Sequence, residues 1–507
     1  MNEAAFQAFQ LADVVAFLPL FILVAMGCVV LLAETFVQAE RRAGLAWLSV
    51  GTCVAALIAI VAQWNDAADL AAATSHFQGM LVVDRTSLFI DAVFLLTAGV
   101  TILFIEPYMR EHGFEIGELY ALILFTTAGM MLVAHAAHLV SLLIGIETMS
   151  LGAYVLTGCW RRSLRSSEAA TKYFLMGAFA TGFLVYGIAL CYGATGGELS
   201  YEGIARKSAE AARQPIFYIG EYFILIALAF KVAAVPFHMW APDVYEGAPT
   251  PVTGFMAAGI KAAAFVGIVR LLGSAFGASF MVVDFTGWAS VLSTLAILTM
   301  TLGNLAALRQ ENVKRMLAYS SIAHAGYLLI GVIAMGLGVT GARPALLFYL
   351  GAYAVTTLGA FGVVAWIGNR TDERLYVDDW SGLASVRPAI ALTMTLFLLS
   401  LAGVPPLGGF FGKLYLFRAA MESPQLYWLV VAAVLNSVVS VYYYLRVVIA
   451  MYFRDPSRPL SPTDSPTFSA GLLLTSVAVV ILGLLPGRVL DWAGAAATTV
   501  VKVATER

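Results

Sequence analysis

The stretch ETMSLGAYVLTG, residues Glu147–Gly158, returns later in the chain as SSIAHAGYLLIG, residues Ser320–Gly331. Both end on the pattern Gly/Ala-Tyr-x-Leu-x-Gly, at an offset of 173 residues. One apolar run further on, FLMGAFA at Phe174–Ala180 matches FYLGAYA at Phe348–Ala354 at an offset of 174 residues. A nearly constant offset over two neighbouring runs indicates an internal repeat, although apolar stretches can also resemble each other by coincidence.

The composition of the chain places this repeat in a membrane. Of the 507 residues, 61% are apolar and 12% are charged, and the mean hydropathy is +0.86. About 20 apolar residues cross the roughly 30 Å hydrocarbon layer as a helix. Such runs fall near residues 14–34, 43–63, 82–105, 118–135, 138–159, 168–192, 218–239, 250–272, 284–308, 313–335, 344–367, 388–421, 425–453 and 468–490. The sequence therefore predicts an all-α polytopic membrane protein with about 14 transmembrane helices.

The offset of the repeat spans five apolar runs. Five is an odd number, so the second copy is expected to lie upside down relative to the first. We therefore predict an N-terminal three-helix segment at 1–117, five-helix repeats at 118–272 and 284–453, and a C-terminal helix and tail at 454–507. Inverted repeats of this kind place a transport site near the middle of the bilayer, between the two halves.

Each half also contains a run that proline interrupts. The seventh run holds KVAAVPFHMW, from Lys231 to Trp240, and the twelfth holds GVPPLGGFFGK, from Gly403 to Lys413. Proline removes a backbone donor and breaks the helix, which frees backbone groups that only protein or water can satisfy. We expect the seventh and twelfth helices to be broken, each beside a lysine.

Four ionisable side chains lie deep inside apolar runs. Lys231, Lys261 and Glu147 are about 10, 14 and 12 Å from the nearer ends of their runs. Lys413 follows the break and has apolar neighbours on both sides. A charge at this depth costs at least about 2.5–3.5 kcal/mol, so each needs a partner, water or a function. The alternatives to a functional role are a fixed structural ion pair and snorkelling of the side chain to the membrane surface. Snorkelling suits Arg270, near the end of its run.

These residue types suit proton transfer. Burial disfavours the charged form of lysine, so a buried lysine can gain and lose a proton, and a nearby carboxylate such as Glu147 can control that exchange. His324 lies mid-span, where imidazole can relay protons or simply be a satisfied core side chain. His238, near a helix end, is a further candidate.

The remaining histidines, and the residues with redox or metal-binding potential, give no second site. His76, His112, His135 and His138 lie in loops or beside a turn, and we expect them to be solvated. The four cysteines are scattered, and no CxxC, HExxH, GxGxxG or phosphate-loop motif occurs. The net charge of -2 offers no pull towards nucleic acid. The sequence predicts no metal or cofactor bound by this chain.

The distribution of basic residues predicts the orientation. Lys and Arg are more frequent in the odd-numbered loops, for example Arg161, Arg162 and Arg165, than in the even-numbered loops. Cytoplasmic loops carry the excess of Lys and Arg, so both termini are expected outside the cytoplasm.

Three stretches carry a resemblance to a known family. KVAAVPFHMWAPDVYEGAPTPVTGFMAAGIKAA (Lys231–Ala263), NVKRMLAYSSIAHAGY (Asn312–Tyr327) and GVPPLGGFFGKLYLF (Gly403–Phe417) resemble the chain N family of the bacterial proton-pumping NADH:quinone oxidoreductase, whose mitochondrial counterpart is subunit 2 of complex I. The likeness extends over nearly the whole chain. It implies a multi-pass protein of the bacterial inner membrane with 14 helices and two inverted five-helix repeats.

The resemblance also implies residue roles and partners. Glu147 and Lys231 match the family's paired charge, Lys261 its linking lysine, Lys413 the lysine of the second half-channel, and His324 a polar position on the central axis. NADH, FMN, iron–sulfur clusters and quinone would belong to other membrane and peripheral subunits, and sister antiporter-like chains would be neighbours. A subunit of a multi-chain cation/proton antiporter and a stand-alone solute permease are the competing hypotheses.

Overall fold

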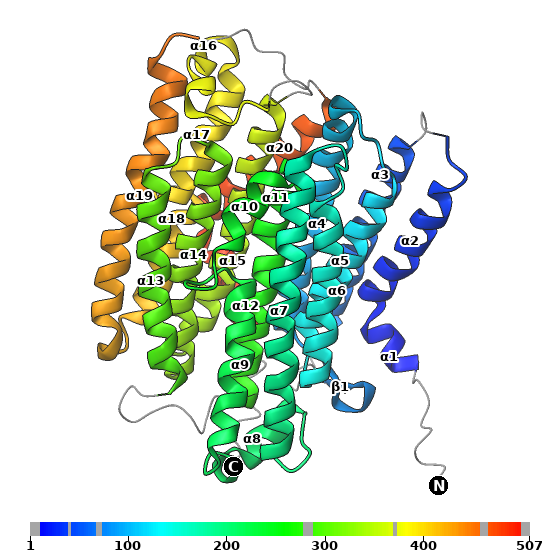
Figure 1. Cartoon of the computed structure of the whole chain (residues 1–507), viewed down its shortest axis with the longest axis vertical. Coiled ribbons are helices and arrows are strands. Elements are labelled where there is room, and N and C mark those ends of the chain that lie inside the picture. Colours follow the sequence, from blue (N-terminus) through cyan, green and yellow to red (C-terminus); the bar gives the residue numbers. More distant parts are fainter. Residues whose placement is uncertain are drawn as a thin grey trace.

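The computed structural model describes residues 11–38, 42–66, 74–276, 287–368, 373–456 and 465–497. Nearly all of this part is helical, and the long helices run side by side (Figure 1). Eleven helices in the described part are long and apolar enough to cross a membrane, and α2 and α17 are shorter apolar helices. The predicted all-α membrane fold is confirmed at this level.

The N-terminal part of the bundle begins with a short helix and three longer ones. These are α1 (Leu11–Ala16), α2 (Leu18–Glu34), α3 (Ala43–Asp66) and α4 (Arg85–His112). A small antiparallel hairpin, β1 (Thr74–His76) and β2 (Leu81–Val83), precedes α4 and was not predicted. The Asp84 side chain accepts a hydrogen bond from the Ser87 backbone and thereby caps α4.

The middle of the chain forms the next group of helices. They are α5 (Glu118–His135), α6 (Leu139–Thr157), α7 (Leu164–Ala194), α8 (Tyr201–Ala211), α9 (Pro215–Lys231), α10 (Trp240–Gly247), α11 (Thr250–Phe255) and α12 (Lys261–Arg270). π-Helical turns at Met256–Ile260 and Leu271–Ala275 flank α12. The predicted short turn between α5 and α6 is confirmed.

The second half of the chain is also built mainly of long helices. They are α13 (Trp288–Leu308), α14 (Val313–Gly336), α15 (Ala342–Ile367), α16 (Leu383–Val386), α17 (Pro388–Ala402), α18 (Gly408–Ala420), α19 (Tyr427–Phe453), α20 (Pro466–Leu484) and α21 (Pro486–Ala497). Short 3-10 turns at Val377–Trp380 and Pro424–Leu426 join them.

Two helix pairs, one in each half, pack with their backbones in close approach. A Cβ at Gly129 would lie 2.5 Å from the Met149 backbone nitrogen, so glycine lets α5 approach α6. A Cβ at Gly326 would lie 2.6 Å from the Met300 backbone nitrogen, between α13 and α14. Each pair contains one of the two similar stretches, Glu147–Gly158 in α6 and Ser320–Gly331 in α14.

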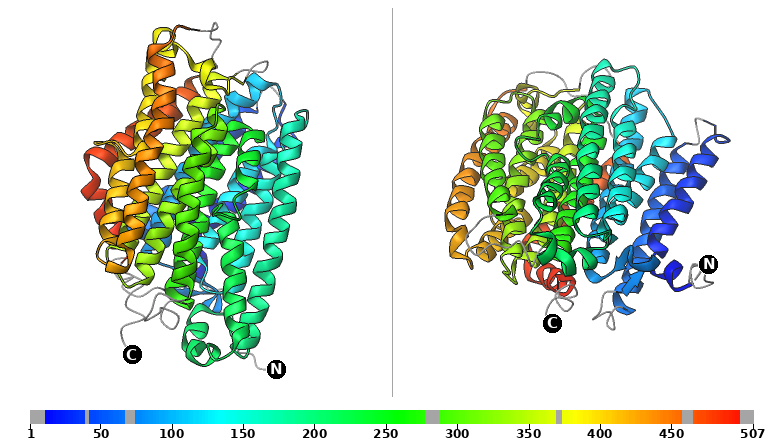
Figure 2. Two further views of the ribbon diagram at one scale, coloured as in Figure 1. Left: turned by 60° about the vertical axis from the view of Figure 1, so that its left-hand side comes forward. Right: turned by 60° about the horizontal axis from the view of Figure 1, so that its bottom comes forward.

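The bundle has two distinguishable ends (Figures 1 and 2). β1 and α8 lie at one end, called here the hairpin end, and α16 lies at the opposite end. The α5–α6 turn joins the hairpin end, because the Leu139 backbone donates to Leu199 and that of Tyr201 donates to Ala137. The predicted location of the termini concerns residues 1–10 and 498–507, which lie outside the described residues.

Both predicted helix breaks are present. α9 ends at Lys231, and an irregular segment at 232–239 leads to α10. α17 ends at Ala402, and residues 403–407 lead to α18, which carries Lys413. The breaks therefore lie beside the two lysines that the sequence singled out.

Candidate functional site

Lys231 lies at the first break and is held by neutral groups. Its side chain is buried at the end of α9. Its ammonium nitrogen Nζ donates to Ser150 Oγ at 2.7 Å and to Tyr154 OH at 3.3 Å, both on α6. Glu147, one turn before Ser150, is half-buried and accepts a hydrogen bond from Thr181 at 2.6 Å. The charge of Glu147 acts on Lys231, but the described residues contain no ion pair of 4 Å or less between them.

Lys261 connects the two halves of the chain. It follows the π-helical turn at Met256–Ile260 and is 2% exposed. Its Nζ donates to the backbone oxygen of Ser321 on α14 at 2.8 Å, and also to the Ser321 hydroxyl. That hydroxyl accepts a further bond from Tyr353 OH on α15 at 2.8 Å. This lysine of α12 therefore reaches the second of the two similar stretches, Ser320–Gly331.

His324 lies one turn further along α14, within a group of tyrosines. Its Nδ1 lies 2.8 Å from Tyr349 OH, and its Nε2 lies 3.3 Å from Tyr444 OH. The charges of Lys261 and Lys413 both act on the imidazole. His324 therefore lies within electrostatic range of both lysines.

Lys413 is bound by the second break. Its Nζ donates to the carbonyl oxygens of Leu401 and Ala402 at 2.9 and 3.1 Å, and to Ser437 Oγ at 2.9 Å. The two carbonyls lie in the last turn of α17, where the helix has no further residue to bond them. Three acceptors match the three N–H donors of an ammonium group. The nitrogen also lies 5.2 Å from the ring centre of Tyr327.

His238 lies apart from the contacts that hold the three lysines and His324. It lies in the irregular segment after Lys231 and is half-buried. Its Nδ1 is buried, and no hydrogen-bond partner is found for it in the described part of the chain. The five other predicted residues each form a side-chain hydrogen bond to a neighbouring helix, whereas His238 stands apart.

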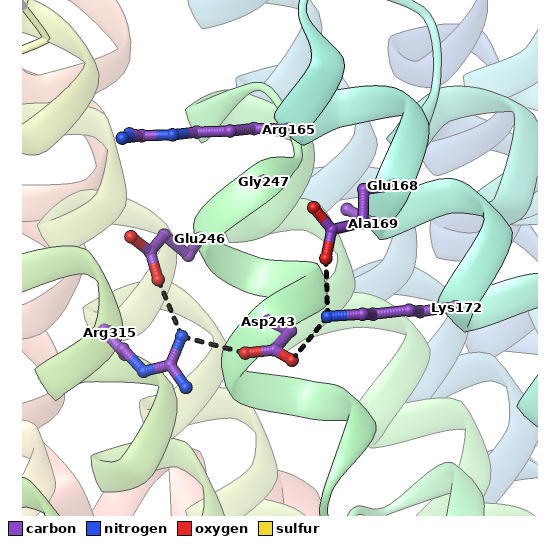
Figure 3. A pocket seen from close by; sticks show the side chains of 8 residues that line it. All are labelled: Arg165, Glu168, Ala169, Lys172, Asp243, Glu246, Gly247 and Arg315. Atoms are coloured by element: carbon purple, nitrogen blue, oxygen red, sulfur yellow. Dashed lines mark hydrogen bonds and ion pairs between the residues drawn. The ribbon is translucent and has the colours of Figure 1, made fainter.

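Charged side chains of α7, α10 and α14 line a cavity of about 220 Å³ (Figure 3). Lys172 pairs with Glu168 at 2.7 Å and with Asp243 at 2.9 Å, and Arg315 pairs with Asp243 at 2.9 Å and with Glu246 at 2.7 Å. These pairs join α7, α10 and α14, and sequence reasoning missed them. They fix α10, the helix that follows the first break.

Aromatic rings separate this cavity from Lys231. Tyr173, next to Lys172 in the chain, stacks on Trp240 with ring centres 4.6 Å apart. Tyr173 also meets Tyr154 edge to face at 4.7 Å, and Tyr154 contacts Lys231. The rings are buried, so they exclude open solvent from the lysine on this side.

Two expectations about charged residues near the surface were wrong. His112 and His135, expected to be solvated, are each 2% exposed. Arg270, expected to snorkel, is 6% exposed and pairs with Asp84 at 2.6 Å. The packing of helices and the hairpin around these positions buries them, and a span boundary in the sequence does not reveal such packing.

Sequence reasoning also missed several buried polar residues. Ser150, Ser321 and Ser437 hold the lysines, yet isolated serines in apolar runs carry no distinctive signal. Glu221 on α9 is 1% exposed, and one of its oxygens has no partner in the described part. Its place inside the run 218–239 could have drawn attention to it. Among the described residues, no group of three or more His, Cys, Asp and Glu is arranged to hold a metal ion.

Comparison with known proteins defines the class to which this fold and site belong. Residues 136–440 match the family described as NADH:quinone oxidoreductase/Mrp antiporter, transmembrane. A chain of the Mrp complex from Dietzia sp. DQ12-45-1b is 22% identical, with a TM-score of 0.82 over 98% of this chain and 99% of that chain. This second likeness shows the shared antiporter-like fold.

Relatives of higher sequence identity identify the family within this class. A chain of respiratory complex I from Thermus thermophilus, solved with bound aureothin, is 33% identical, with a TM-score of 0.78 over 94% of this chain and 100% of that chain. The NADH-quinone oxidoreductase subunit N of Trichlorobacter lovleyi is 44% identical over 96% of this chain and 97% of the relative. The chain belongs to the NADH-quinone oxidoreductase subunit N family and is an antiporter-like membrane subunit of that oxidoreductase.

Replacing Ser321 with alanine tests the link between the halves. Ser321→Ala removes the hydroxyl that joins Lys261 to Tyr353 but keeps the backbone carbonyl. Hydrogen bonds to charged groups contribute about 1.5–3 kcal/mol, so we expect proton pumping to fall several-fold relative to NADH oxidation. Pumping and NADH oxidation are measured together in membrane vesicles.

Ser293→Ala is the matched control, since Ser293 is buried on α13 and bonds only the Ala289 carbonyl of its own helix. Equal pumping in the two variants would show that the Ser321 hydroxyl takes no part in proton transfer.

Proposed function

We propose that this chain translocates protons through Glu147, Lys231, Lys261, His324 and Lys413, coupled to quinone reduction elsewhere in the oxidoreductase. The observation that carries this proposal is the chemistry around the three lysines. Each is at most 5% exposed, and hydroxyl and carbonyl oxygens are its hydrogen-bond partners. Within the described residues none of the three forms an ion pair of 4 Å or less. A fixed structural ion pair, the main alternative for such residues, would require one.

Neutral partners leave the lysine proton free to move. A carboxylate in contact would hold the proton by about 4 kcal/mol at an effective dielectric of about 20. A hydroxyl accepts from an ammonium group and donates to a neutral amine, so it suits both protonation states. Ser150 and Tyr154 offer this to Lys231, and Ser321 offers it to Lys261.

Glu147 is suited to control Lys231 from a distance. It acts on the lysine electrostatically without a direct bond, and its carboxylate is tied to Thr181 on the neighbouring helix α7. A small movement of α6 against α7 would change the separation of the two charges. That change would raise or lower the tendency of Lys231 to hold its proton. His238 lies beside the first break, and we assign it no step in this proton transfer.

The described helices also support the finer architecture that we propose. About 14 spans would form a three-helix segment at 1–117, inverted five-helix repeats at 118–272 and 284–453, and a C-terminal part at 454–507. The breaks after Lys231 and before Lys413 would belong to the seventh and twelfth spans. The glycine-packed pairs α5–α6 and α13–α14 would be equivalent elements of the two repeats.

The setting of the chain follows from the same family. We place it in the bacterial inner membrane with both termini on the periplasmic side, which the excess of Lys and Arg in the odd-numbered loops supports. Its partners would be the other membrane and peripheral subunits, sister antiporter-like chains included. NADH, FMN, iron–sulfur clusters and quinone would be bound by those partners.

Lys231→Ala tests the first part of the path. Without the amine, the proton loses its acceptor at the end of α9, so we expect a large loss of pumping. Assembly of the oxidoreductase, read from its intact size and NADH oxidation, should persist. Lys207→Ala is the control, because this lysine of α8 is 42% exposed, donates to the Thr195 backbone oxygen and pairs with Glu198 at 3.8 Å, away from the breaks. Full pumping in Lys231→Ala would contradict the proposal.

Lys413→Ala tests the second part. We expect fewer protons pumped per NADH oxidised, because the carbonyls of Leu401 and Ala402 would lose the ammonium that they bind. The ratio of protons to electrons is measured in proteoliposomes that contain the whole complex. A normal ratio in this variant would show that protons bypass the second break.

A further inference from the structure

Five buried charged or ionisable residues gather at the hairpin end, apart from the lysine path. Asp84 caps α4, and Asp91 lies on the same helix; His135 ends α5, Arg270 ends α12, and Arg343 lies in the first turn of α15. Their exposed fractions are 0, 1, 2, 6 and 8%. This group, called here the hairpin-end cluster, joins the N-terminal helices to both halves of the chain.

The hydrogen bonds of His135 leave one proton shared with Asp91. Its Nδ1 lies 2.8 Å from the backbone oxygen of Val82, which can only accept, so Nδ1 carries a hydrogen. Its Nε2 lies 2.7 Å from Asp91 Oδ2. A proton on Nε2 gives an ion pair, and a proton on Oδ2 gives a neutral pair. The two forms differ only in the position of one proton along one short bond.

The charges in the rest of the cluster act on that shared proton. Asp84 and Arg270 are paired at 2.6 Å and cancel each other's charge. Arg343 has no ion-pair partner in the described part, and its charge acts together with those of Asp84 and Arg270. With the shared proton the cluster carries one positive charge, and without it the cluster is neutral.

Several buried polar atoms of the cluster have no hydrogen-bond partner in the described part of the protein. Asp91 Oδ1, Asp84 Oδ2, Arg270 Nε and Arg343 Nη1 are buried and have no partner among the described residues. The buried hydroxyl of Tyr201 on α8, near Arg270, has none either. Buried polar atoms of this kind are normally bonded to internal water. A purely structural ion pair would not require so many unsatisfied atoms around it.

One helix connects this cluster to the lysine path. Arg270 lies nine residues after Lys261 on α12, which corresponds to about 14 Å. A π-helical turn precedes Lys261, and another follows Arg270. π-Helical turns inside helices are often found at functional sites. A change of charge at Arg270 can therefore act on Lys261 through this helix.

We propose that the Asp91–His135 pair is a second proton-exchange site, which passes protons between internal water and the hairpin end of the protein. The shared proton leaves for a water molecule, Asp91 remains as carboxylate and His135 as neutral imidazole, and a proton from water later restores the pair. The proposal rests on the proposed function, since it extends the same proton path. The other facing groups are Tyr201 and, across the Phe17 ring, the His76–Asp13 pair.

Two conservative variants of the whole oxidoreductase test the site. Asp91→Asn and His135→Gln keep a hydrogen-bonding side chain but cannot share the proton. We expect NADH oxidation and assembly to persist, while protons pumped per electron fall several-fold. His76→Gln is the matched control, because His76 lies 2.8 Å from Asp13 at the same end but is more exposed. Full pumping in assembled Asp91→Asn and His135→Gln would overturn the proposal.

Arg343→Gln separates proton exchange from a structural role, and decides the matter if the first variants do not assemble. It touches neither member of the pair but removes one positive charge from the cluster, so that release of the shared proton would leave the cluster with a net negative charge. The pair should therefore hold its proton more tightly. The pH profile of pumping is then expected to move upward by about one pH unit. An unmoved profile would overturn the proposal. A normal ratio in Asp91→Asn beside a loss in Lys231→Ala would reject this site alone, whereas full pumping in Lys231→Ala would reject the proposed function.

Discussion

A charged amine inside a membrane must be solvated by the protein itself, and the rest of this structure depends on how that is done. Three lysines lie in the interior of the bundle, where an uncompensated charge costs several kcal/mol. Lys413 is bound by two carbonyl oxygens from the end of α17 and by Ser437. A continuous helix would use those carbonyls internally, so the break in the helix is what makes them available.

The two breaks are themselves stabilised by side chains from other helices. At the first, Trp240 Nε1 donates to the Phe230 carbonyl at 2.9 Å, and the Val235 backbone donates to Thr299 at 2.9 Å. At the second, the Gly409 backbone donates to Ser400 Oγ at 3.1 Å. Irregular backbone at membrane depth is tolerated where protein satisfies it in this way. Each break therefore lies beside a buried lysine, and a third lysine, Lys261, bonds Ser321 on α14.

Much of the fold could be predicted from the sequence, because its signals are local. Apolar runs predict the helices, and the prolines at Pro236 and Pro405 predict the breaks. Lysines deep inside apolar runs stand out because burying a charge there costs free energy. The partners of the lysines could not be predicted, since Ser150, Ser321 and Ser437 gain meaning only when distant helices pack together. His135 was misjudged for the same reason: it lies beside a short turn, but the hairpin and Phe17 cover it.

The central claim is that these buried amines change protonation while the oxidoreductase turns over. The most direct test is ¹⁵N nuclear magnetic resonance of the lysine side chains in the assembled complex, at rest and during NADH oxidation. A neutral amine signal should appear during turnover and be absent from the Lys231→Ala, Lys261→Ala or Lys413→Ala variant whose lysine produces it. Ammonium signals alone, under every condition, would contradict the account.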